Sequence, residues 1–306
     1  MCAIIHDVAM STSQKNDIER NLTMSVKIFI DSASDILPSE AEALDLIHVP
    51  MTVRFGMDEY LDGAELSHEE FYEKLIESDT IPTTSQIPPA VWQTYFEREL
   101  DEDDTAVVIT VSSSFSGTYQ SACLAASAFG GRIRVVDSET LCIAEGVLAK
   151  RACEIRDTGA SADEIAAILD AEKKSLHVIA MLDTLEYLKK GGRISSAVAF
   201  AGGILGIKPV ITIKDGAVVL LGKARGSKQG NNLLRELVSK VGGIDFSRPF
   251  ALAYSGCDDK LLQKYIADST ELWEGKVDTL PIYTVGCCIG THAGPGAVAI
   301  AFFADN

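Results

Sequence analysis

Residues 105–118, TAVVITVSSSFSGT, join an apolar β-branched run to a turn rich in hydroxyl groups. A run such as Thr105–Val111 is typical of a parallel strand that is buried on both faces of its sheet. An amphipathic pattern over 117–129 follows and predicts a helix. The turn therefore lies at the carboxyl end of a strand, the edge at which open α/β sheets bind their ligands.

Similar units surround this one in the first half of the chain. Apolar runs at 26–30, 47–53 and 133–136 predict three more strands. Strand alternating with helix predicts a doubly wound, mainly parallel sheet. The helices are expected from Pro38 through Leu44 and Leu46, after the Ser67/Glu70 capping box, from Pro88-Pro89 to Leu100, and over 117–129 and 139–156.

The pattern changes after Gly159. Runs 209–214 and 217–223 flank Asp215-Gly216, which is a strong β-hairpin signal. The other strands are expected at 176–182, 250–254, 280–285 and 297–303, and the helices at 161–174, 184–191, 227–241 and 258–272. We therefore expect an α/β protein with an N-terminal extension (1–24), an N-terminal α/β domain (25–160) and a C-terminal mixed α/β domain (161–306).

Composition excludes several classes of protein. The 306 residues are 47% hydrophobic and 23% charged, as in globular proteins, and the net charge is -17. Such a surface repels nucleic acid. The longest stretch free of both charge and strong polarity, Ala197–Ile207, is too short for a membrane helix, which needs ~20 residues. The beginning of the chain has no basic leader, so we expect a cytoplasmic protein without integral membrane contact.

The seven cysteines show no CxxC spacing and are expected to be reduced, mostly as small core residues. For the vicinal pair Cys287-Cys288 we expect packing in a strand, with redox activity as the alternative. The chain has no GxxxxGK[ST], GxGxxG, HExxH or GxSxG motif, and its five histidines have no metal-ligand spacing. We expect no cofactor and no metal site.

Two hydroxyl-rich turns, 82–89 and 112–118, each precede a predicted helix. Ser116 and the backbone N–H groups at a helix start can bind an oxyanion, assisted by the helix dipole. The alternative is that these hydroxyls serve as helix caps.

Two glycine-rich segments lie in the second half. Lys189-Lys190-Gly191-Gly192-Arg193 ends a short helix and precedes the small-residue run 197–207, which either lines an apolar cavity or forms an ordinary core helix. His292 lies in 290–297, which is expected to be a tight loop before the last strand.

Together these segments resemble the DegV family of bacterial fatty-acid-binding proteins, from about Lys27 to the end of the chain. The similar segments, in family order, are IFIDS (28–32) with Asp35-Ile36, PTTSQ (82–86), SSFSGTYQSA (113–122), VDS (136–138), LEYLKKGGRIS (185–195), IKP (207–209), KARG (223–226) and HAGPGA (292–297).

The resemblance implies two α/β domains with a long-chain fatty acid in a tunnel at their interface. Thr84 and Ser116 match the family's carboxylate-binding threonine and serine, and the adjoining Ser85 and Gly117 are also expected to bind the ligand. The protein would be a non-catalytic carrier that presents the carboxylate to a separate ATP-dependent fatty acid kinase subunit for phospholipid metabolism. Arg193, Arg225 and His292 match residues near the head group or the partner surface, with Arg193 and His292 also expected at the ligand. Ile87 and Ala224 depart from the family pattern without touching these contacts.

An enzyme acting on a small carbonyl or phosphorylated metabolite is the alternative, because related folds occur in dihydroxyacetone kinases. Those enzymes attach their substrate through a histidine, and His292 is the plausible equivalent here.

Overall fold

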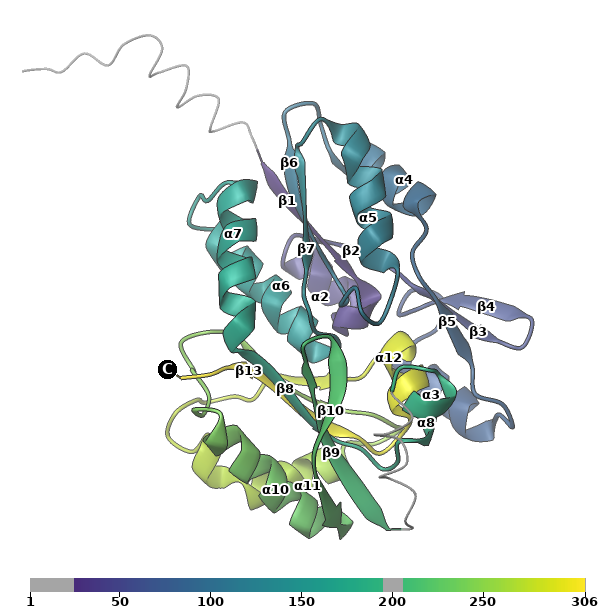
Figure 1. Ribbon diagram of the computed structural model, residues 1–306, viewed down its shortest axis with the longest axis vertical. Coiled ribbons are helices and arrows are strands. Elements are labelled where there is room, and N and C mark those ends of the chain that lie inside the picture. Colours follow the sequence, from purple (N-terminus) through teal and green to yellow (C-terminus); the bar gives the residue numbers. More distant parts are fainter. Residues whose placement is uncertain (1–24, 195–205, 306) are drawn as a thin grey trace, which may run out of the picture.

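The computed structural model describes residues 25–194 and 206–305 (Figure 1). They contain a four-stranded, a six-stranded and a three-stranded sheet. The two larger sheets follow one another along the long axis of the molecule, and the smallest lies to one side of them (Figure 1). Each described helix is too short or too polar to span a membrane.

The N-terminal sheet is entirely parallel, as predicted. Its order is β2 (Leu46–Val49), β1 (Val26–Asp31), β6 (Thr105–Thr110), β7 (Ile133–Asp137). Alternate residues of its strands enter two apolar cores, one on each face. The helices on one face are α4 (Pro89–Glu99) and α5 (Thr118–Ala126), and those on the other are α6 (Ile143–Arg156) and α7 (Ala162–Glu172).

The single strand predicted over 47–53 is wrong. Proline has no N–H for the strand ladder, and the run divides at Pro50. β2 stays in the parallel sheet, whereas β3 (Thr52–Phe55) pairs antiparallel with β4 (Asp58–Leu61) and β5 (Thr83–Ser85). The turn at 82–89 therefore begins as a strand of the small sheet.

Helix starts follow their local signals where a cap is present. Glu70 N–H donates to Ser67 Oγ (3.3 Å) and Ser67 N–H to Glu70 Oε2 (3.1 Å), which starts α3 (His68–Glu77) as predicted. Two of the other predicted bounds are wrong. α2 (Pro38–Ala43) ends before Leu44, and α6 begins four residues late because Glu139 (φ 55°) and Cys142 (φ 62°) have left-handed backbones.

The C-terminal sheet is mixed, as predicted. Its strands are antiparallel to their neighbours except for the β11–β12 pair. The hairpin turns at Asp215-Gly216, where both residues have positive φ, as a type I′ turn requires. The strand order is β10 (Ala217–Arg225), β9 (Ile207–Lys214), β8 (Leu176–Met181), β13 (Val298–Phe303), β11 (Phe250–Tyr254), β12 (Ile282–Thr284), with α10 (Gly226–Lys240) and α11 (Lys260–Asp268) on one face.

The two halves of the chain share one apolar core. Helix α6 packs against β1 and β6 and also against β8, β11 and β13 of the other sheet. Helix α7, which follows residue 160, packs on β6 and β7. Because these contacts connect the two halves of the chain, they do not test the domain boundary near residue 160, which stays a prediction.

The prediction of a loop over 290–297 is wrong for residues 290–293, which are helical. Cys287–Ala293 form helix α12, which ends at Gly294 with a φ of 70°. Cys287 and Cys288 are therefore in the first turn of a helix and not in a strand. Although it comes from the end of the chain, α12 lies against α3, β3 and β5 on one side and α8 (Glu186–Lys190) on another (Figure 1).

Candidate ligand-binding site

A pocket lies between the carboxyl edge of the parallel sheet and the C-terminal sheet. Ala33, Val111 and Leu141 follow β1, β6 and β7 and form its first wall. The atom-free space inside it, including its open mouth, is about 970 Å³. The position matches the ligand crevice expected at this edge.

The opposite wall is largely apolar because residues of four strands, β8, β9, β10 and β13, line the pocket with aliphatic side chains. Along β8, Val178 and Ala180 line it, whereas Ile179 and Met181 point to the core under α10 and α11. Several of the facing side chains are small, which leaves the space open. The apolar residues of this wall are Val178, Ala180, Leu182, Ile211, Ile213, Val218, Ala297 and Ala299.

Four polar side chains that the sequence singled out line this pocket. They are Thr84 on β5, Ser116 before α5, Arg193 after α8 and His292 on α12. Although up to 208 residues separate them along the chain, the fold brings all four to one cavity.

Thr84 and His292 are in direct contact, with 3.0 Å between Oγ1 and Nε2. Burial, and after it the nearby Arg193 charge, lower the pKa of His292 to about 4, so the ring is neutral near pH 7. Nδ1 is buried and has no hydrogen-bond partner in the described part of the chain. We therefore place the ring proton on Nε2, where it donates to Thr84 and leaves the threonine O–H free to donate into the pocket.

The close packing of His292 depends on Gly191. A β-carbon at residue 191 would lie 2.2 Å from His292 Nδ1. The glycine after α8 is thus needed for the space it leaves beside the imidazole.

Ser116 combines the two roles that its sequence position left open. Its Oγ accepts the Thr118 N–H (3.3 Å) and lies 2.9 Å from Thr118 Oγ1. Accepting that N–H satisfies one backbone donor at the start of α5. When Thr118 Oγ1 is the donor between the two hydroxyls, the serine O–H is available as a donor at the pocket wall.

Arg193 supplies a positive charge at the same end. Its Nε donates to the Phe115 carbonyl (3.3 Å) and Nη1 donates to the Gly191 carbonyl (2.7 Å). Among the described residues these partners are backbone oxygens and not carboxylates, so the guanidinium charge is available to an anion in the pocket.

The other predicted site residues lie outside the lining. Ser85 is exposed and pairs with Thr52 on β3, and Arg225 is exposed at the end of β10. A β-carbon at Gly117 would lie 1.9 Å from Gln86 Oε1, so a larger residue there would displace the end of the glutamine side chain. The roles of Ser85, Gly117 and Arg225 at the site stay predictions. The run 197–207, for which a cavity lining or a core helix was expected, lies outside the described residues as far as residue 205.

Sequence reasoning did not assign Gln86 to the site, although it lies in the quoted turn. It lines the pocket, and its Nε2 donates to Ser121 Oγ (3.0 Å) on α5. This bond ties the segment of Thr84 to the helix that follows Ser116. The available signal was the position of Gln86 two residues after Thr84 on a short strand.

Three buried carboxyl groups adjoin the pocket wall. Asp31 accepts the N–H groups of the lining residues Ala33 (2.9 Å) and Val111 (2.8 Å), and Asp35 accepts that of Gly286 (2.8 Å). Burial raises the pKa of both aspartates to about 7. Burial, and then the charges of Asp31 and Asp35, raise the pKa of Glu145 well above its usual value.

Known proteins resemble the whole described chain. A family model described as "Uncharacterised protein, DegV family" matches residues 25–305. A DegV domain-containing protein of Caldanaerobacter subterraneus is 34% identical over 279 residues, which cover 90% of this chain and 98% of that protein.

Two crystallised proteins share the fold at 30% identity, each covering 92% of this chain and all of the other. One is a Thermus thermophilus DegV family protein described by its fatty acid binding (TM-score 0.81), and the other is DegV of Bacillus subtilis, described as a fatty acid binding protein (TM-score 0.74).

Proposed function

Because the chain belongs to the DegV family, we propose that it is a carrier that binds a long-chain fatty acid in the pocket between its two halves. One observation carries this proposal: apart from Thr212, whose hydroxyl donates to the Val178 carbonyl (2.7 Å), the pocket is lined by apolar residues along β8, β9 and β13, and Thr84, Ser116, His292 and Arg193 form a separate polar set. An aliphatic chain with a single carboxylate has the same distribution of polarity.

Burial of the acyl chain supplies the affinity. Each methylene that leaves water contributes about 0.8 kcal/mol, so a long chain outweighs the cost of ordering the ligand. A buried carboxylate requires hydrogen-bond donors or an opposite charge. Thr84 and Ser116 each have a hydroxyl proton to donate, and Arg193 provides the charge.

Native mass spectrometry of the purified chain tests the binding function. We expect a bound species of several hundred daltons, which organic extraction releases as a free fatty acid. The rival is an enzyme that uses His292 to attach a small carbonyl compound. A chain that carries no lipid, takes up none from added fatty acid and turns over a triose would contradict the carrier function.

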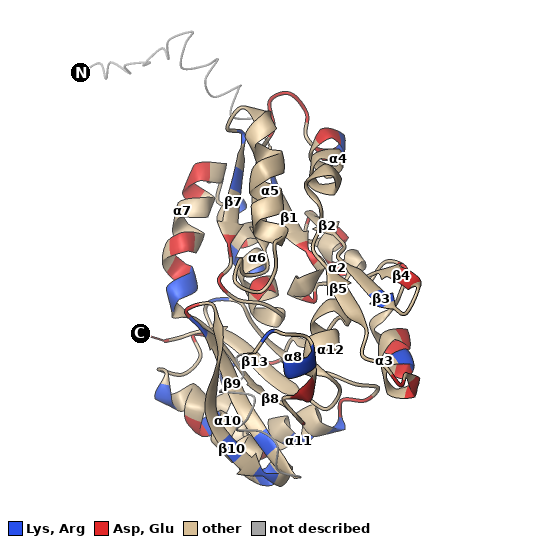
Figure 2. Ribbon diagram, turned by 45° about the vertical axis from the view of Figure 1, so that its right-hand side comes forward, with Lys and Arg blue, Asp and Glu red and all other residues tan. Residues whose placement is uncertain are grey.

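We further propose that the bound carboxylate is presented to a separate kinase subunit. Support comes from the basic groups near the polar end of the pocket: Arg193 lines it, and Lys189 and Lys190 make α8 a basic segment beside α12 (Figure 2). A carboxylate that becomes an acyl phosphate gains negative charge, which cationic donors stabilise.

A substitution of Arg225 tests presentation to the kinase independently of fatty acid binding, because Arg225 is exposed and lies outside the pocket lining. With a cognate kinase and ATP, Arg225→Ala should reduce acyl phosphate formation at least ~10-fold, as loss of a charge-assisted contact of ~1.5 kcal/mol or more predicts, while fatty acid affinity is unchanged. Lys240→Ala, at the other end of α10, is the matched control. Full phosphorylation by Arg225→Ala would remove this residue from the partner surface.

A further inference from the structure

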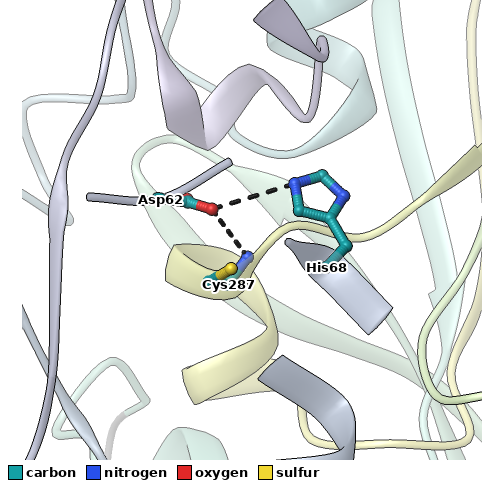
Figure 3. Close-up of side chains that lie close together, drawn as sticks. All are labelled: Asp62, His68 and Cys287. Atoms are coloured by element: carbon teal, nitrogen blue, oxygen red, sulfur yellow. Dashed lines mark hydrogen bonds and ion pairs between the residues drawn. The ribbon is translucent and has the colours of Figure 1, made fainter. Parts of the chain in front are cut away.

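Asp62, His68 and Cys287 form a buried cluster that the pocket does not use (Figure 3). Asp62 follows β4, His68 begins α3, and Cys287 begins α12, 225 residues after Asp62. The side chains of Asp62 and His68 are 1% and 9% exposed, and Cys287 is 0% exposed. Tertiary structure thus brings a carboxylate, an imidazole and a thiol together in the protein interior.

The spacing of their donor atoms suits a metal ion. One carboxylate oxygen, one ring nitrogen and the sulfur all lie within 4.8 Å of one another, and Asp62 Oδ1 is 3.8 Å from His68 Nε2. In a tetrahedral zinc site with bonds of ~2.0–2.3 Å, neighbouring ligand atoms are ~3.3–3.8 Å apart. The present separations therefore exceed those of a zinc site by at most about 1.5 Å, a distance that side-chain rotation covers.

The existing hydrogen bonds leave the metal-binding atoms of this cluster free, and those to Asp62 also orient its carboxylate. Asp62 Oδ1 and Oδ2 accept the N–H groups of Cys287 and Cys288, both at 3.0 Å. Each carboxylate oxygen has a second lone pair, so these bonds fix the carboxylate and still allow it to bind a metal. The Cys287 sulfur has the weak contacts of a thiol donor, 3.5 Å to the Leu66 carbonyl and 3.9 Å to that of Ser67.

Charge balance also favours a cation here. Asp62 is buried, and in the described part of the chain the basic side chain within 4 Å of its carboxylate is His68, which carries no charge when its ring is neutral. A divalent ion bound by the Asp62 carboxylate, the Cys287 thiolate and neutral His68 would form a neutral unit. The thiol proton would go to solvent when the metal binds.

We propose that Asp62, His68 and Cys287 bind a divalent transition-metal ion, with zinc as the expected occupant because this ion takes oxygen, nitrogen and sulfur ligands together. Three protein ligands leave one position for water. The ion would join the β4–α3 connection to the first turn of α12, the helix that carries His292 near its other end. This proposal does not depend on which ligand occupies the pocket.

The test uses the full chain, stripped of metal with a chelator and titrated with Co²⁺ and with Zn²⁺. We expect one ion per chain, a thiolate-to-Co²⁺ charge-transfer absorption band that Zn²⁺ abolishes, and a higher thermal unfolding midpoint with Zn²⁺ present. Cys287→Ser should lose the band altogether. His68→Asn should keep a thiolate ligand but bind Co²⁺ more weakly.

Cys288→Ser is the matched control, because Cys288 is the adjacent buried cysteine and its sulfur contacts Met51 Sδ at 3.5 Å. This variant, together with Cys2→Ser and Cys257→Ser, should retain the band. If the wild-type chain takes up no metal, or if Cys287→Ser binds Co²⁺ with an unchanged spectrum, the cluster is a hydrogen-bonded contact and the proposal is wrong. The wild-type titration decides even if Cys287→Ser fails to fold.

Discussion

The free energy of unfolding should fall by about 2–4 kcal/mol as the pH rises from 6.5 to 8, because ~1.4 kcal/mol is lost per pH unit for each proton that only the folded state retains. The pKa values of Asp31 and Asp35 are raised to about 7 and that of Glu145 lies well above normal. In the unfolded chain these groups are already ionised at pH 6.5. The folded state therefore binds more protons than the unfolded state, so stability decreases with rising pH.

Below pH 6.5 buried histidines act in the opposite direction. Burial lowers the pKa of His48 and His292 to about 4, and it also lowers the pKa of His68 and His177. Between about pH 4 and 6.5 these rings bind protons more readily when unfolded, so stability is lost as the pH falls through this range. We therefore expect a stability maximum near pH 6.5.

Urea unfolding of the wild type and of Glu145→Gln at pH 6.5, 7.2 and 8 measures the effect. The neutral amide cannot lose a proton, so the variant should show less than half of the wild-type decline. Glu154→Gln, an exposed position on the same helix α6, is the control and should follow the wild type. Parallel declines for wild type and Glu145→Gln would mean that Glu145 is not the group that retains the proton.

Removing both hydroxyl donors, in Thr84→Ala with Ser116→Ala, should weaken fatty acid binding ~100-fold or more. A hydrogen bond to a charged group contributes about 1.5–3 kcal/mol, and both bonds are lost. Folding should survive, because both side chains are only partly buried and loss of the Ser116 cap costs about 1 kcal/mol. Calorimetric titration of delipidated protein with a fatty acid gives the affinity.

The neighbouring hydroxyls provide a matched control for this double variant. Thr83 and Ser113 lie in the same two turns but outside the pocket lining, so Thr83→Ala with Ser113→Ala should bind as the wild type does. An unchanged affinity in Thr84→Ala with Ser116→Ala would place the carboxylate elsewhere, with Arg193 as the remaining charged group in the pocket.

Local chemistry was sufficient to predict most elements of the fold. The β-branched run Thr105–Val111 became β6, the Ser67/Glu70 pair started α3, and Asp215-Gly216 closed the hairpin. These signals are local because a strand pattern, a cap or a turn depends on residues that are close in sequence. The order of family-like segments likewise indicated the fold and directed attention to Thr84 and Ser116, which both line the pocket.

Where local signals competed, the sequence was misread. Pro50 interrupts an apolar run that otherwise reads as one strand, and the positive φ of Cys142 delays a helix whose composition suggests an earlier start. For residues 290–297, three glycines suggested a loop, although 290–293 are helical. Packing explains one of them, since a β-carbon on Gly290 would lie 2.6 Å from Phe71 and Tyr72 of α3.

The sequence by itself determined the class of fold and the donors available to a ligand, because both follow from residue type and local periodicity. Tertiary structure alone decided which distant groups meet. Thr84 contacts His292 across 208 residues, and Asp62 holds the start of α12 across 225. Such contacts leave no periodic trace in the chain, because they arise when the last helix packs against elements of the first half and when burial then removes water from their side chains.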